Sequence, residues 1–161
     1  MEHPRIEIEE TMARYLQVRA DIDAGRGTWA DLAQFFTEDA VFIDPAWGRV
    51  EGLDEMRRTV FGDAMDGLEE WKFPVDFWAV TGDTIIVKWR QILPGRRDDG
   101  RPYQQSGIST IVYAGGGKFR YEEDILNMVH VFEDMKASRC AVPSVAVPPA
   151  VIDRDFSVPD V

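Results

Sequence analysis

The sequence has few of the residues that carry redox and metal chemistry. Cys140 is the only cysteine in 161 residues, so the chain cannot form an internal disulfide. One cysteine and two histidines also provide no Cys/His cluster for a structural zinc site, and we expect no metal. A single thiol is typical of a reducing compartment, which favours a cytoplasmic protein.

Basic residues are scarce as well. Eighteen lysines and arginines stand against 29 acidic residues, which gives a formal net charge of −11. Such a surface repels phosphate backbones and anionic lipid headgroups, so we expect neither nucleic acid nor a membrane as a partner. No apolar run approaches the length of a membrane span, and residues 1–10 lack the apolar stretch of a signal peptide.

Familiar catalytic signatures are also missing. The chain contains no Ser/His/Asp set, no glycine-rich phosphate loop and no group of metal ligands. We therefore expect no cofactor. Acidic and hydroxyl side chains remain as the candidates for chemistry.

What is present begins with helical patterns. Apolar residues at three- and four-residue spacing predict a helix over 6–24. Similar patterns predict a second helix from Thr28, with Asp31 as its capping partner, and a third over 53–64. Residues 40–44 form a predicted strand that ends at Pro45, and a loop follows over 46–52.

The pattern then changes to the two-residue period of strands. The predicted strands are 72–80, 84–93, 103–113 and 118–126, the first two joined by a hairpin turn and the second and third by a polar loop over 94–102. A short helix is expected over 127–138. Helices followed by an antiparallel meander predict one α+β domain over residues 1–140.

Residues 141–161 follow neither period. Four prolines favour extended backbone, but the many valines and Phe156 make the segment too apolar for a merely solvated tail. It is either disordered or lies along this subunit or a dimer partner.

Asp44 is the most informative acidic residue. It ends the short strand among Val41, Phe42 and Ile43, so it lies at the edge of a hydrophobic region whichever face is buried. Burial would raise the pKa of Asp44 toward neutrality and make it a usable general base. The alternative is structural, because an Asp before Pro often caps the turn by accepting hydrogen bonds from backbone amides.

Three segments together resemble the nuclear transport factor two-like (NTF2-like) superfamily: FFTEDAVFIDPAWGRVEGLDEMRRTVF at 35–61, the GGGK turn at 115–118 and FRYEEDILN at 119–127. This superfamily includes ketosteroid isomerase, SnoaL-type polyketide cyclases, limonene epoxide hydrolase and scytalone dehydratase. The resemblance covers about residues 6–136. It implies a cone-shaped fold, with three N-terminal helices packed in a strongly bent antiparallel sheet, a short C-terminal helix, an extended tail and a pocket at the open end. It also implies a homodimer.

The resemblance assigns roles to individual residues. Asp44 falls where ketosteroid isomerase keeps its proton-transferring carboxylate, and Tyr15 falls where that enzyme keeps its oxyanion-binding tyrosine. The second oxyanion donor of that enzyme is an Asp, and Ser109 stands at this position here. A hydroxyl is a weaker donor than a protonated carboxyl, so the match to steroid isomerases fails at this point.

Asp124 is the second candidate carboxylate. The resemblance places it on the pocket side of the last strand, near an aspartate with which limonene epoxide hydrolase activates water. Its alternative role is an ion pair with Arg90 or Arg120, or a charge at a helix N-terminus. Hydrophobicity turns Trp89 and Gln91 inward and Arg90 outward, whereas the opposite orientation would place charges in the pocket and favour hydrolysis.

The sequence therefore predicts a pocket with Asp44, Tyr15 and Asp124 as catalytic residues. The candidates for substrate binding are Trp47, as a gate over the pocket, together with Trp89, Arg90, Gln105, Ser109 and Glu122; core packing is the alternative for the tryptophans. We expect a cofactor-independent acid–base enzyme of the isomerase, cyclase, dehydratase or hydrolase type that acts on a small hydrophobic molecule. A non-catalytic small-ligand-binding or assembly module is the alternative.

Overall fold

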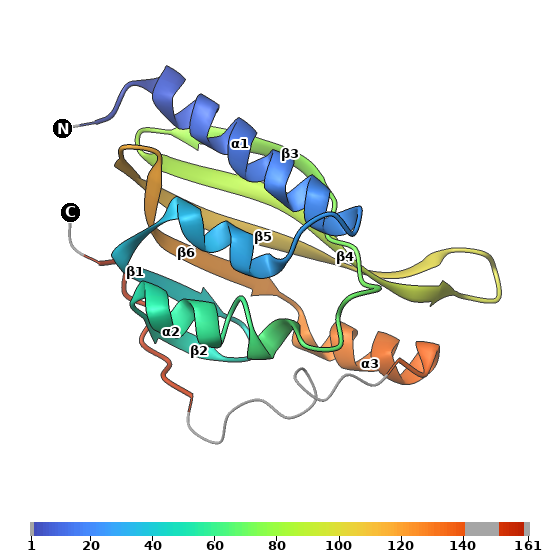
Figure 1. Cartoon of the computed structure of the whole chain (residues 1–161). Helices are drawn as coiled ribbons and strands as arrows, with labels where there is room; N and C mark the ends of the chain where they lie inside the picture. Colours follow the sequence, from blue (N-terminus) through green and yellow to red (C-terminus); the bar gives the residue numbers. More distant parts are fainter. Residues whose placement is uncertain (1, 141–151, 160–161) are drawn as a thin grey trace.

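The computed structural model describes residues 2–140 and 152–159 and shows a bent sheet with helices packed against its concave face (Figure 1). In chain order the elements of the described residues are α1 (Arg5–Asp23), the 3₁₀ helix η1 (Trp29–Phe35), β1 (Phe36–Asp44), β2 (Gly48–Glu51), α2 (Leu53–Arg58), the 3₁₀ turn η2 (Asp63–Met65), β3 (Val75–Thr81), β4 (Thr84–Arg96), β5 (Pro102–Gly115), β6 (Lys118–Leu126) and α3 (Met128–Ser138). This is the expected α+β order.

The sheet is mixed, which corrects the expectation of a wholly antiparallel one. Its strand order is β2-β1-β6-β5-β4-β3, and every neighbouring pair is antiparallel except β1 and β6. β1 runs parallel to β6, with Phe42 opposite Glu122. The chain thus returns after about 80 residues to place its last strand beside its first, and this pairing brings the two candidate carboxylates to one end of the sheet.

Several predicted boundaries differ from the structure. The second helix is a 3₁₀ helix and not an α-helix. Its expected cap is present, since the Thr28 N–H donates to Asp31 Oδ2 at 2.8 Å. Residues 46–52 are not only a loop, because they contain strand β2. Lys72 forms only an isolated bridge with Ile92 before β3 begins at Val75, and β4 extends to Arg96.

The core lies between the concave face of the sheet and the helices. Alternate residues of β4 point into it, including Ile85, Val87 and Trp89, whereas Lys88 and Arg90 point outward, as hydrophobicity predicts. α1 contributes Ile8, Met12 and Tyr15 from one face. In the described part of the chain, no helix is long and apolar enough to cross a membrane.

Part of the predicted tail is described, and it lies along β2 (Figure 1). The Arg49 backbone N–H donates to the carbonyl of Asp153 at 2.9 Å, and Arg49 Nη1 donates to the carbonyl of Ser157 at 2.8 Å. Residues 152–159 therefore follow the alternative in which the tail lies along its own subunit. The predictions for residues 141–151 and 160–161 lie outside the described residues.

Candidate functional site

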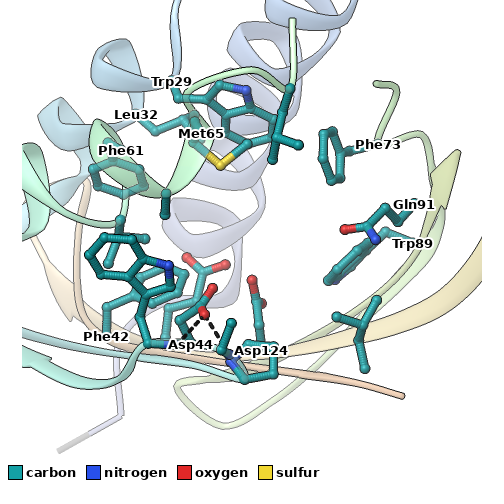
Figure 2. Close-up of a pocket in the computed structure, with 18 of the residues that line it drawn as sticks. Trp29, Leu32, Phe42, Asp44, Phe61, Met65, Phe73, Trp89, Gln91 and Asp124 are labelled. Atoms are coloured by element: carbon teal, nitrogen blue, oxygen red, sulfur yellow. Dashed lines mark hydrogen bonds between the residues drawn. The ribbon is translucent and has the colours of Figure 1, made fainter. Parts of the chain in front are cut away.

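A cavity of about 110 Å³ lies between the helices and one end of the sheet (Figure 2). Most of its wall is apolar, contributed by Trp29, Leu32, Phe42, Trp47, Val60, Phe61, Ala64, Met65, Leu68, Phe73, Trp89, Leu126, Met128 and Val131. An apolar cavity of comparable volume holds a single aromatic ring. Its size and lining therefore suit a small and largely apolar molecule.

Asp44 brings a carboxylate into this wall from the end of β1. Its Oδ1 accepts hydrogen bonds from the backbone N–H groups of Ala46 at 2.7 Å and Trp47 at 2.8 Å, which close the turn into β2. Burial raises the pKa of Asp44, while these two bonds lower it by less. Both alternatives drawn from the sequence are thus present in one side chain, because Asp44 caps its turn and is also shifted toward the behaviour of a base.

Strand β6 supplies two more carboxyl groups. Glu122 and Asp124 are two residues apart, so both point to the concave face. Burial raises the pKa of Glu122 well above its usual range, and the nearby charge of Asp124 raises it further. Burial likewise raises the pKa of Asp124, with a further contribution from the charge of Asp44. Three acidic groups share one end of the cavity, and their mutual repulsion favours the retention of a proton among them.

A hydrogen-bond chain orients Asp124. Trp89 Nε1 donates to Ser109 Oγ at 2.8 Å, and Ser109 Oγ donates to Asp124 Oδ1. Indole is a donor only, so Ser109 Oγ accepts from Trp89 and its own hydroxyl proton is available for Asp124. Ser109 is also 1% exposed. The prediction that Ser109 contacts a substrate oxygen is therefore corrected, because Ser109 does not line the cavity and its hydroxyl contacts Trp89 and Asp124 instead.

Helix α1 places Tyr15 and Arg19 one turn apart on the wall. Tyr15 Oη lies 3.4 Å from both carboxylate oxygens of Glu122 and donates to them. Arg19 Nη2 donates to the Phe73 carbonyl at 3.2 Å, its guanidinium lies 6.0 Å from the centre of the Trp89 ring, and its buried Nε has no hydrogen-bond partner among the described residues. The positive charge of Arg19 holds down the pKa values of Glu122 and Asp124.

Not every predicted site residue reaches the cavity. Six of them line it: Asp44, Tyr15, Asp124, Trp47, Trp89 and Glu122. Arg90 does not, because it lies on the outer face of β4 and its Nε contacts Asp76 Oδ1 at 2.9 Å. Gln105 does not line the cavity either. It is buried on β5, next to Gln91 of β4, from which it accepts a hydrogen bond. The alternative ion pair of Asp124 with Arg90 is likewise not formed.

Two polar residues of the cavity wall, Arg19 and Gln91, were missed by sequence reasoning. Arg19 lies on the apolar face of α1, one turn after Tyr15, and a charged residue on such a face is the signal that could have found it. Gln91 was predicted to face inward but was given no role. Its signal is the polar break in the inward row Ile85, Val87, Trp89.

Comparison with known proteins assigns the chain to a family. Residues 14–121 match the model of the SnoaL-like domain, and the chain belongs to that family. The particular relatives are distant, and no curated protein matches the chain in sequence.

Solved structures agree with this assignment at the level of the fold. A candidate SnoaL-like polyketide cyclase from Jannaschia sp. CCS1 is 15% identical, with 92% of this chain and 99% of that chain covered and a TM-score of 0.61. An NTF2-like protein from Anabaena variabilis is also 15% identical, with 79% and 94% covered and a TM-score of 0.61. TerC, crystallised with polyporic acid, is 14% identical, with 81% and 98% covered and a TM-score of 0.62. The NTF2-like cone that the sequence predicts is therefore confirmed.

Proposed function

We propose that the cavity is the active site of a cofactor-independent acid–base enzyme acting on a small, largely apolar molecule. The observation that carries this proposal is the grouping of Asp44, Glu122 and Asp124 with one guanidinium, Arg19, in an otherwise apolar wall. Groups with perturbed pKa values gathered in a cleft are typical of catalytic sites. The family and its relatives support acid–base chemistry of this kind.

The geometry suggests a division of roles. Asp44 uses one carboxylate oxygen to cap its turn, which leaves Oδ2 to accept a proton from a carbon or from water. The proton held by Glu122 or Asp124 can be donated to the oxygen on which negative charge develops, and Arg19 stabilises that charge. Ser109 and Trp89 position Asp124 for this step. Isomerisation, cyclisation, dehydration and hydrolysis can each use such a base and acid.

The proposal can be tested before a natural substrate is known. The assay is hydrogen–deuterium exchange at the α-carbon of 2-cyclohexenone and 2-indanone in D₂O, followed by proton NMR. We expect the protein to accelerate exchange over buffer, and Asp44→Asn to lower that acceleration by about a hundred- to ten-thousand-fold. Asn keeps a carbonyl oxygen that can cap the turn, so the fold should be retained. Asp54→Asn, on an exposed side chain, is the matched control.

The alternative is a binding module, and the capping role of Asp44 favours it. In that case the ketones would bind without exchange, or Asp44→Asn would leave the exchange rate unchanged. Either result would contradict the enzyme and leave a small-ligand site.

A further inference from the structure

A row of buried polar side chains runs from the cavity wall to helix α3. Gln91 on β4 lies opposite Gln105 on β5, and Gln91 Nε2 donates to Gln105 Oε1 at 2.9 Å. Gln105 Nε2 donates to Asp134 Oδ2 at 2.6 Å, and Arg97 donates to the other oxygen of Asp134. Gln91, Gln105 and Asp134 are 8%, 4% and 4% exposed, so their partners are fixed within the protein.

The direction of this row is set by its far end. A carboxylate only accepts hydrogen bonds, and Asp134 is paired with the guanidinium of Arg97, which only donates. Gln105 must therefore turn its amino group toward Asp134 and its carbonyl oxygen toward Gln91. Gln91 must in turn give its amino group to Gln105, which leaves its own carbonyl oxygen for the cavity. Figure 2 shows the oxygen of Gln91 pointing into the cavity, and no described side chain donates to it.

We propose that Gln91 determines specificity by accepting a hydrogen bond from a hydroxyl group of the ligand. The inference rests on the proposed function only in taking the cavity as the ligand site. With the apolar wall, it defines the ligand class as a compact alcohol or phenol whose hydroxyl points toward β4. A ligand without a donor would leave a buried acceptor unpaired, which we expect to cost about tenfold or more in affinity.

Asp134 acts on the ligand only through the row, as a positioning residue. If Asp134 is replaced by Asn, the far end can donate as well as accept. Arg97 can only donate, so it holds the carbonyl oxygen of the amide and leaves the amino group to face Gln105. Gln105 and Gln91 would then both reverse, and the cavity would be offered an amino group in place of the carbonyl oxygen. The preference for a hydroxyl should therefore fall without any change in the cavity wall.

The experiment compares two matched probes, 4-fluorophenol and 4-fluoroanisole, whose binding at pH 6.5 is followed by fluorine NMR. We expect the wild type to bind the phenol about tenfold more tightly than its methyl ether. Gln91→Met, similar in size but without the amide, should remove this preference by weakening the phenol alone. Asp134→Asn should reduce the preference several-fold, whereas Glu133→Gln, the same change on an exposed neighbour in α3, should leave it intact.

Three results would overturn the inference. The wild type could bind the ether at least as well as the phenol, or bind neither probe at about 10 mM, a concentration that detects even weak sites. Gln91→Met could keep the preference while Asp44→Asn removes it, which would assign the hydroxyl to the carboxylates. Retained binding of 4-fluoroanisole shows that each variant still forms the cavity. Because neither probe needs to react, a failure of the acid–base proposal would leave this test unaffected.

Discussion

Glu122 and Asp124 lose hydration in the folded protein, and this makes their ionisation costly there but not in the unfolded chain. Burial and neighbouring acidic charge raise both folded-state pKa values, so the folded protein binds more protons than the unfolded one above about pH 4. The free energy of unfolding contributed by this pair is therefore highest in acid and declines as the pH rises toward 8. Ionisation of these two groups is thus opposed by folding.

This sign gives a prediction for Glu122→Gln. The variant removes one of the two groups that ionise at a cost, so it should gain stability relative to the wild type between pH 5 and pH 8 by more than about 1 kcal/mol. Urea unfolding at the two pH values measures the difference. Glu10→Gln, on an exposed side chain, should show no such gain. An equal change in both variants would mean that folding does not raise the pKa of Glu122.

Ser109→Ala should affect both its partners. The Trp89 indole N–H and Asp124 each lose a hydrogen bond inside the protein, which should cost about 1–3 kcal/mol in the free energy of unfolding. The Ser109 bond lowers the pKa of Asp124, so its loss should move that pKa upward. Carbon-detected NMR titration of the Asp124 carboxyl group measures the shift. Ser106→Ala, exposed on the same strand, is the control, and an unmoved titration would contradict the assigned proton direction.

At this scale the sequence predicts which carboxylates share the cavity but not their partners. Asp44 follows from its strand end, and the resemblance to the NTF2-like superfamily places Glu122 and Asp124 on the pocket side of the last strand. Ser109 and Gln105 were assigned to the substrate because the register between β4, β5 and α3 cannot be read from alternation alone. That register gives the proton of Ser109 to Asp124 and turns Gln105 toward Asp134.

Strand β2 is the element that sequence patterns missed. Four residues are too few for alternation to be recognised, and Gly48, with φ of +74°, reads as part of a loop. A methyl group at Gly48 would also lie 2.2 Å from the carbonyl oxygen of Asp153 in the tail. The strand is therefore specified by its contacts with β1 and with residues 152–159. The intrinsic strand propensity of its own four residues does not predict these contacts.

Gly48→Ala tests this contact. The left-handed backbone and the clash with Asp153 should together destabilise the protein by more than about 2 kcal/mol and displace the tail. Gly25→Ala has nearly the same positive φ but nothing within 4 Å, so it isolates the backbone cost, about 1 kcal/mol. Thermal unfolding and limited proteolysis of the tail measure the two effects. Equal losses in both variants would show that the tail contact contributes nothing.

For the molecule as a whole, we expect a homodimer formed through the outer face of the sheet. Phe77, Lys88, Ile108 and Ile125 lie opposite one another across β3, β4, β5 and β6. The three apolar members of this row are 60%, 42% and 59% exposed. Exposed apolar residues gathered on one sheet face, here on either side of Lys88, are typical of an interface. The row complements the resemblance to a superfamily with many homodimers.

Light scattering should therefore give about twice the chain mass of 18.3 kDa. Ile125→Glu places a charge in the row and should weaken association by about a hundredfold or more. Val129→Glu, equally exposed but on α3 outside the row, should not. A wild-type protein that is monomeric at every concentration would contradict this surface assignment.

The parallel pairing of β1 with β6 also imposes a delay during synthesis of the chain, because β1 is made long before its partner strand. Asp44 leaves the ribosome about 80 residues before Asp124, which at ordinary rates of synthesis is roughly 4 to 16 seconds. During that interval the first strand has no partner on the side where the last strand will lie, and the acidic cluster does not exist. A chain interrupted anywhere before β6 lacks Glu122 and Asp124, so it cannot form the cluster. The cluster therefore exists only in molecules whose synthesis has passed β6 and whose folding has paired it with β1.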